Sequence, residues 1–137
     1  MRVVLDTNIL LSALITPDGM SSRIVDAWFE DRFELLTHAL QLDELRGVTR
    51  RHRIRARFRP AEAGRLVNRL YAGAVFVGRL PRIARSDDPG DDFLLAVCEA
   101  GEADYLVTGD KTGLLALARH GRTAILTARD FLNLIQM

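Results

Sequence analysis

The sequence is poor in cysteine and lysine, and it has no long apolar run. Its one cysteine, Cys98, excludes an internal disulfide and a cysteine-based zinc site, and its apolar helical surroundings favour a small buried hydrophobe. No stretch approaches the ~20 apolar residues that a membrane span requires. Asp6 and Asn8 interrupt the apolar segment near the N-terminus, which argues against a signal peptide. We therefore expect a reduced, cytoplasmic protein.

The formal net charge of only +1 favours neither a nucleic-acid nor a membrane partner for the chain as a whole. The basic residues are nevertheless unevenly placed: all but Lys111 are arginines, and they are dense between Arg46 and Arg59. A chain of 137 residues suffices for one hydrophobic core. No linker, repeat or low-complexity tract divides it, so we expect a single domain over residues 1–137.

Short apolar runs alternate with helical patterns, as in parallel α/β proteins. We expect Ser21 or Ser22 to cap the second helix and Thr37 to cap the third. The sequence predicts a three-layer α/β/α sandwich with a mostly parallel, about five-stranded sheet. The predicted strands cover 2–5, 33–36, 75–77, 104–108 and 123–126, and the predicted helices cover 8–15, 21–32, 38–48, 60–74, 89–101, 111–119 and 128–135.

Two predicted strands lead to a carboxylate, directly at Asp6 and after Gly109 at Asp110. Asp6 ends the first strand, and Asp110 follows the fourth. In open parallel sheets, ligands bind outside the carboxyl ends of the strands, where the topology switches. Asp is also common in turns and helix caps, but Thr7 or Asn8 can provide a cap here. Because Asp6 then has no structural role left, we interpret it as functional.

The third predicted helix offers two adjacent acids, Asp43 and Glu44. Glu44 lies four residues after Leu40 and four before Val48, so it is expected on their apolar face. A buried carboxylate there needs a compensating cation. An arginine partner is one explanation and a metal ion is the other, which we favour because more acids converge on the same sheet edge.

The segment "SDDPGDDFLLAV" places four aspartates beside a predicted helix. Asp88 before Pro89 fits an N-cap, and Asp91 fits the acid of a capping box. Asp92 is the acid that capping does not explain, since it lies one turn from residues that pack on the sheet. Spacing alone does not decide between Asp91 and Asp92, and Asp87 has no assigned role.

The candidate site thus consists of carboxylates alone. An all-oxygen set suits Mg²⁺ or Mn²⁺ and argues against zinc. Clustered carboxylates also repel one another unless a cation is present. A cation at such a site can bind phosphate oxygens and activate water, which predicts phosphodiester hydrolysis. The candidate acids are Asp6, Glu44, Asp92 and Asp110.

The motifs together resemble the PIN-domain family, most closely its bacterial VapC-like toxin branch. The matching segments are "VVLDTNILLSAL", "LDELRGV", "DPGDDFLLA", "ADYLVTGD" and "TARDFLNLI", in an order that covers almost the whole chain. The resemblance implies an α/β/α metal-dependent ribonuclease. It matches Asp6, Glu44, Asp92 and Asp110 to the family's metal-binding acids, and thereby favours Asp92 over Asp91. It also implies that Asn8 orients Asp6 and that Thr108 lines the pocket.

The resemblance also implies partners. These are an RNA substrate, a small cognate antitoxin that covers the acidic groove, and a second copy in a homodimer. Trp28 and Phe29 fit a dimer contact and a core position equally well. The segment "RRHRIRARFR" fits both a solvated loop and a contact with the RNA backbone. Its candidate RNA-binding residues are Arg50, Arg51, Arg53 and Arg55.

The leading hypothesis is therefore the endoribonuclease toxin of a type II toxin–antitoxin pair. One alternative is a PIN-like RNA-binding module without turnover, although all four acids are present. Another is a phosphoacceptor signalling domain, but Lys111 follows the fourth strand rather than the last, so it fits badly. An aspartyl phosphatase would need an acid where Asn8 stands.

Overall fold

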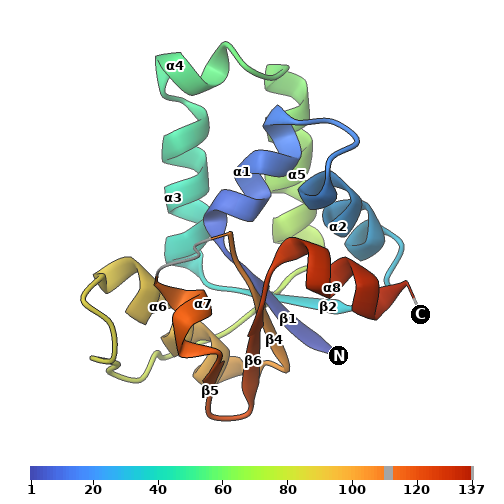
Figure 1. Cartoon of the computed structure of the whole chain (residues 1–137). Coiled ribbons are helices and arrows are strands. Elements are labelled where there is room, and N and C mark those ends of the chain that lie inside the picture. Colours follow the sequence, from blue (N-terminus) through green and yellow to red (C-terminus); the bar gives the residue numbers. More distant parts are fainter. Residues whose placement is uncertain (110–112, 137) are drawn as a thin grey trace.

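The computed structural model of this chain describes residues 1–109 and 113–136. A six-stranded sheet forms its centre, and helices cover both faces (Figure 1). The strand order is β3-β2-β1-β4-β6-β5, and every neighbouring pair is parallel except β5 with β6. The architecture is the expected α/β/α sandwich with a mostly parallel sheet.

The predicted strands are all present, and one strand was missed. The short strand β5 pairs antiparallel with β6 at the sheet edge, so the helix predicted over 111–119 ends earlier than expected. The strands are β1 Arg2–Leu5, β2 Glu34–Thr37, β3 Val75–Phe76, β4 Tyr105–Val107, β5 Arg119–His120 and β6 Thr123–Leu126. The helices are α1 Thr7–Ile15, α2 Met20–Phe29, α3 Ala39–Thr49, α4 His52–Arg55, α5 Pro60–Gly73, α6 Pro89–Gly101, α7 Leu114–Leu117 and α8 Ala128–Ile135.

The alternation of side chains along the strands divides the core between the two faces of the sheet. Val3 and Leu5 of β1 pack with α1, α2, α3, α5 and α8, whereas Val4 packs with α6 and α7. Both faces of the central strands β1, β2 and β4 are buried, which explains why these strands are largely continuous apolar runs. Trp28 is buried in the first of these clusters and Phe29 packs against it, so both contribute to the core.

Two helix caps differ from the sequence prediction. The cap of α3 is His38, whose Nδ1 accepts a hydrogen bond from the backbone N–H of Leu40 at 3.0 Å. Thr37 is instead the last residue of β2 and is buried. Helix α2 begins at Met20 after Gly19, and therefore earlier than the predicted serine caps.

Gly101 ends α6 for a packing reason. A Cβ atom at Gly101 would lie 2.6 Å from Cδ1 of Leu36 and 2.9 Å from Cγ1 of Val77. Glycine thus allows α6 to approach β2 and the segment after β3 closely. The left-handed backbone conformation that often follows a helix is adopted by Glu102, with φ of 53°.

The topology places a crevice at the carboxyl ends of β1 and β4. The chain passes from β1 to β2 and β3 on one side and returns to β4 on the other side. Such a switch in direction is where ligands bind in open α/β sheets. Helices α3 and α5 extend beyond this edge, and α4 lies between their far ends (Figure 1). Across the described ranges, no helix has the length and apolar content to cross a membrane.

Candidate active site

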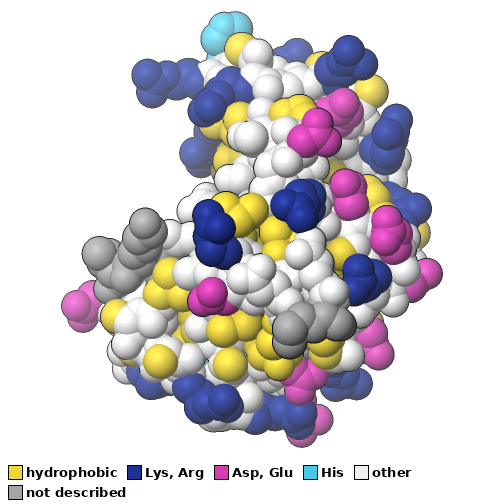
Figure 2. Space-filling view, turned by 45° about the vertical axis from the view of Figure 1, so that its right-hand side comes forward, with side chains coloured by type: hydrophobic (Ala, Val, Ile, Leu, Met, Phe, Trp, Pro, Cys, Tyr) yellow, Lys and Arg dark blue, Asp and Glu magenta, His cyan; other side chains and the backbone are white. Residues whose placement is uncertain are grey.

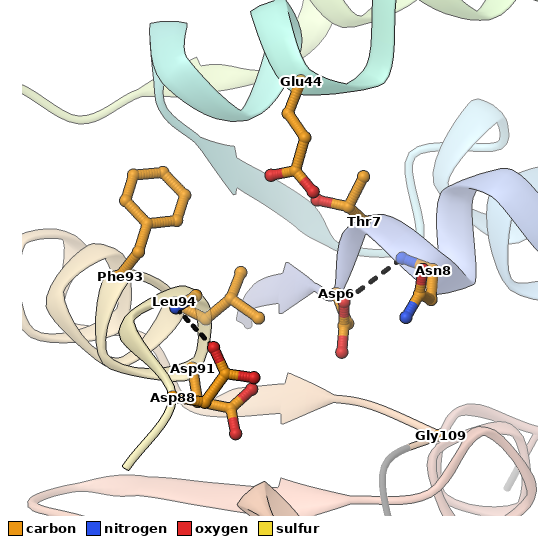
Figure 3. A pocket seen from close by; sticks show the side chains of 10 residues that line it. Asp6, Thr7, Asn8, Glu44, Asp88, Asp91, Phe93, Leu94 and Gly109 are labelled. Atoms are coloured by element: carbon orange, nitrogen blue, oxygen red, sulfur yellow. Dashed lines mark hydrogen bonds between the residues drawn. The ribbon is translucent and has the colours of Figure 1, made fainter. Parts of the chain in front are cut away.

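An open cavity of about 670 Å³ lies outside the carboxyl ends of β1 and β4 (Figure 3). Carboxylates from three segments border it: the end of β1, helix α3, and the beginning of α6. The topology therefore brings together acids that are far apart in the sequence. The lining residues are Asp6, Thr7, Asn8, Glu44, Asp88, Gly90, Asp91, Phe93, Leu94 and Gly109.

Asp6 is held in place by bonds to both of its carboxylate oxygens. Oδ1 accepts a hydrogen bond from the backbone N–H of Asn8 at 3.1 Å, which makes Asp6 the N-cap of α1. Oδ2 accepts a hydrogen bond from the Thr108 hydroxyl at 2.8 Å. The expectation that Asp6 has no structural role was therefore wrong, because its side chain both caps a helix and borders the cavity.

Asn8 bonds Asp6 as the resemblance implies, although through its backbone N–H, whereas Thr108 is not placed as the resemblance implies. Thr108 is fully buried and orients Asp6 through its hydroxyl, instead of lining the cavity. Asn8 lines the cavity and bonds Asp6 through its backbone N–H. Both residues support Asp6, but the buried threonine is the one whose side chain fixes its orientation.

Glu44 lines the cavity and Asp43 does not. The physical reason differs from the one argued from the sequence. Leu40 is 58% exposed, so the face it shares with Glu44 is not part of the core. Glu44 is itself exposed and points from α3 toward Thr7 (Figure 3). The buried stripe of α3 consists of Gln41, Leu42, Leu45 and Thr49.

The charges in the cavity repel one another. Although Glu44 is exposed overall, partial desolvation of its carboxyl raises the pKa of Glu44 above its ordinary value, the negative charge of Asp6 raises it further, and the positive charge of Arg51 opposes them. A carboxylate whose pKa rises because of a neighbouring carboxylate gains from a nearby cation. The electrostatics of Asp6 and Glu44 therefore favour a bound cation.

Gln41 is a supporting residue that the sequence analysis missed. Its Nε2 donates a hydrogen bond to the carbonyl oxygen of Leu5 at 2.7 Å, and its Oε1 accepts one from the Thr37 hydroxyl at 2.6 Å. Gln41 is 2% exposed. It thus ties α3, which carries Glu44, to the residue before Asp6. The available signal was its spacing, since Gln41 precedes Leu45 by four residues and so shares the buried face of α3.

The acidic segment before α6 is divided differently from the prediction. Asp88 caps α6 as expected, with Oδ1 accepting from the Gly90 N–H at 2.8 Å. Asp91, half-buried, lines the cavity. Asp92 Oδ1 accepts hydrogen bonds from the backbone N–H groups of Arg85 and Ser86, at 3.1 and 2.8 Å. The structure therefore turns Asp92 toward the preceding loop and puts Asp91 in the position expected for Asp92.

The capping box expected at α6 is also replaced. The backbone N–H of Asp88 donates to the Ser86 hydroxyl at 3.0 Å, which is the bond that a capping box would have given to Asp91. Asp87 lies along a second hollow of about 590 Å³, which also borders Asp88 and Asp91. The turn over 86–91 thus separates two neighbouring hollows.

The carboxylate oxygens around the cavity are the type of ligand that Mg²⁺ and Mn²⁺ prefer. Asp110, the fourth predicted acid, lies outside the described residues, while Gly109 before it borders the cavity. Within residues 1–109 and 113–136, no three His, Cys, Asp or Glu side chains form a ready-made metal cluster. Mg²⁺ keeps several waters and needs only one or two carboxylates. Carboxylates around an open cavity therefore suit it better than zinc, which prefers closed nitrogen and sulfur sites.

The four arginines predicted to bind RNA lie around α4 but do not form one group. Arg50 and Arg55 border a hollow of about 380 Å³ between α3, α4 and α5. Arg51 lies close enough to Glu44 for its positive charge to oppose the rise in the pKa of that carboxyl, although it does not line the cavity. Arg53 is exposed. Of the four, Arg50 and Arg55 thus border a hollow, while Arg51 influences the carboxylate of Glu44.

Comparison with known families places the chain in one of them. A profile of the PIN domain matches residues 2–112, a range that contains every residue lining the carboxylate cavity. PIN domains are generally nucleases, so the match favours a nuclease-type hydrolase over the phosphoacceptor alternative. No curated protein matches the chain.

Proposed function

Because the chain belongs to the PIN-domain family, we propose that it is a divalent-metal-dependent endoribonuclease that hydrolyses RNA phosphodiester bonds. The observation that supports this most directly is the convergence of Asp6, Glu44 and Asp91 on one cavity at the switch point of the sheet. Their shared chemistry is that of ligands for Mg²⁺ or Mn²⁺.

In this proposal the acids hold the cation and the residues behind them keep the acids in place. Asp6, Glu44 and Asp91 are the metal-binding residues, together with Asp110 as predicted from the resemblance. Mg²⁺, when bound, would supply charge neutralisation at the phosphate and a lowered pKa for a bound water. Thr108 fixes the Asp6 carboxylate.

The surroundings of the cavity suit a phosphodiester substrate. The N-termini of α1 and α6 both border it, and helix N-termini favour anions. Arg51 adds a positive charge on the side of Glu44. We propose that Arg50, Arg51, Arg53 and Arg55 contact the RNA backbone, which would make binding salt-dependent.

The sequence resemblance extends this proposal to a biological role. As the toxin of a type II toxin–antitoxin pair, the protein would be a homodimer, and a small antitoxin would cover the carboxylate cavity. An adjacent reading frame for a small protein that forms a complex with this chain and inhibits its cleavage would support the role. Cleavage that is unaffected by the neighbouring gene product would contradict it.

The enzymatic proposal is tested with purified protein, structured RNAs, and Mg²⁺ or Mn²⁺, beside an Asp6→Asn variant. Asparagine retains an oxygen that can cap α1, so the variant is expected to fold and to lose cleavage. Equal cleavage by both proteins would contradict the site, and equal cleavage in excess EDTA would contradict the metal requirement. RNA binding without any cleavage by the wild-type protein would indicate a module without turnover.

A further inference from the structure

A second set of exposed or partly exposed side chains lies on the other side of α3 from the carboxylate cavity. Glu44 points into the cavity, whereas Arg46 follows two residues later, about 200° around the helix axis, and contacts α5. We call the set to which Arg46 belongs the Arg–aromatic strip. It consists of Arg46, Arg50, Arg55, Tyr71 and Phe76.

The basic part of the Arg–aromatic strip surrounds a hollow. Arg46, Arg50 and Arg55 border the hollow of about 380 Å³ between α3, α4 and α5. In the part of the chain that the structure describes, none of these three guanidinium groups has a carboxylate within 4.0 Å. Arginine side chains gather around the end of the molecule that carries α4 (Figure 2). The hollow is therefore a site of uncompensated positive charge.

The aromatic part continues directly from Arg46. The Arg46 guanidinium carbon lies 4.8 Å from the centroid of the Tyr71 ring. The Tyr71 and Phe76 rings are stacked, with centroids 6.1 Å apart and planes at 23°. Tyr71 is 51% exposed and Phe76 is 38% exposed, so part of each side chain remains accessible to a ligand beside these contacts.

We propose that the Arg–aromatic strip binds single-stranded RNA, with phosphates on the arginines and unpaired bases on Tyr71 and Phe76. A basic groove that continues into exposed aromatic rings is how proteins bind single-stranded nucleic acid. Bases in a duplex stack on one another and are not free for such rings. The choice of RNA over other polynucleotides rests on the proposed ribonuclease function, and the strip lies outside the carboxylate cavity.

Charge also distinguishes RNA from a second copy of this chain. A two-fold symmetric contact through this face would bring the same patch of both protomers together. The guanidiniums of Arg46, Arg50 and Arg55 would then lie near their own counterparts, where like charges repel. A polyanion complements the same surface.

The experiment measures the anisotropy of a fluorescein-labelled oligouridylate of about 12 nucleotides in EDTA, so that binding is separated from cleavage. Tyr71→Leu is expected to weaken binding at least about fivefold, because a base stacks on an aromatic ring. Tyr71→Phe keeps the ring and should therefore bind as the wild type does. Arg50→Gln with Arg55→Gln should lower the slope of log affinity against log salt by about 1.4. A blunt duplex should bind more weakly and respond less to Tyr71→Leu.

A substitution at Gly64 can test the hollow without disturbing the fold. It borders the hollow, and a Cβ atom there would meet no atom within 4 Å. Gly64→Leu should obstruct the hollow and weaken binding, while its unfolding temperature stays equal or rises because leucine favours helix over glycine. Arg129→Gln on α8 and Met20→Leu on α2 are the matched controls, and both should bind as the wild type does.

Equal binding of the oligouridylate by the wild type, Tyr71→Leu and Gly64→Leu would overturn the inference. So would a dimer in light scattering that Tyr71→Leu converts to a monomer with RNA binding unchanged, since the strip would then be an interface between copies. Failure of the ribonuclease proposal has a different result: the wild type would bind through the strip and cleave nothing in Mg²⁺ or Mn²⁺.

Discussion

The two edges of the central sheet differ in how they hold carboxylates. At the amino edge, Asp104 precedes β4 and accepts hydrogen bonds from the backbone N–H of Arg2 at 2.8 Å and from the guanidinium of Arg122 at 2.9 Å. At the carboxyl edge, no basic side chain of the described residues lies within 4.0 Å of the Asp6 or Glu44 carboxylate.

For this reason the pKa of Asp104 at the amino edge and the pKa of Glu44 at the carboxyl edge shift in opposite directions. The hydrogen bond from the Arg2 backbone, with help from Arg122, holds the pKa of Asp104 below its usual value. Burial and the charge of Asp6 raise the pKa of Glu44. Paired acids at one edge stabilise the fold, whereas acids that repel one another in a cavity indicate a site for a cation.

The largest expected effect comes from neutralising the cavity acid on α3. Glu44→Gln keeps the size of the side chain but removes a charge from the proposed metal site. Loss of one electrostatic contribution to a transition state typically lowers the rate by about 10²–10³-fold. We therefore expect a loss of that size in the rate of metal-dependent RNA cleavage, measured under single-turnover conditions.

Asp43→Asn is the matched control, because Asp43 lies next to Glu44 in α3 but outside the cavity. Its cleavage rate should equal that of the wild type. If Asp43→Asn lost activity and Glu44→Gln kept it, the placement of the cavity as the catalytic centre would be wrong.

The next effect separates the two adjacent aspartates of α6. Asp91→Asn should weaken Mn²⁺ binding, measured by calorimetry, because Asp91 borders the cavity. Asp92→Asn keeps an oxygen that can accept the N–H bonds of Arg85 and Ser86, so its metal affinity should stay close to that of the wild type.

Asp92→Ala provides the complementary measurement. It removes both bonds to the 85–86 backbone, and we expect it to lower the free energy of unfolding by about 1–3 kcal/mol. Because the turn is loosened, cleavage should also fall, but by less than in Glu44→Gln. Loss of Mn²⁺ binding in Asp92→Asn, with Asp91→Asn unaffected, would restore the assignment made from the sequence.

The sequence was sufficient for the features that depend on local patterns. Continuous apolar runs located the strands, and Asp88 before Pro89 located the start of α6. Because parallel strands align their carboxyl ends, Asp6 was placed at the correct edge. Glu44 was placed on the correct helix turn for the wrong reason, since the face it shares with Leu40 is exposed. Periodicity identifies a face of a helix but not what covers that face.

The features that the sequence missed depend on contacts with distant segments. Asp91 and Asp92 differ by about 100° on a helix, and the N–H groups of Arg85 and Ser86, in an irregular loop, decide which acid turns away. Likewise, Thr108 is buried behind Asp6 because it follows β4, which lies in the middle of the sheet. Such partners have no fixed spacing, so no local pattern indicates them.

The smallest expected effect tests the two edges through stability in EDTA. The raised folded-state pKa of Glu44 means that its contribution to stability is present below the unfolded pKa and is lost as pH rises through the folded pKa. The lowered pKa of Asp104 gives the opposite sign: its contribution is present above the unfolded pKa and is lost as pH falls through the folded pKa. At neutral pH without metal, Glu44→Gln should therefore stabilise the protein and Asp104→Asn should destabilise it.

Urea unfolding measures both effects. Because Asp104 is paired near the surface, we expect its loss to lower the unfolding free energy by about 1 kcal/mol or less. Both differences should shrink as the pH is lowered into the range where carboxylates protonate. Saturating Mn²⁺ should reverse the sign for Glu44→Gln alone, since the cation stabilises only a protein that binds it. If Glu44→Gln destabilised the metal-free protein at neutral pH, the cavity acids would be structural like Asp104, and the contrast between the two edges would fail.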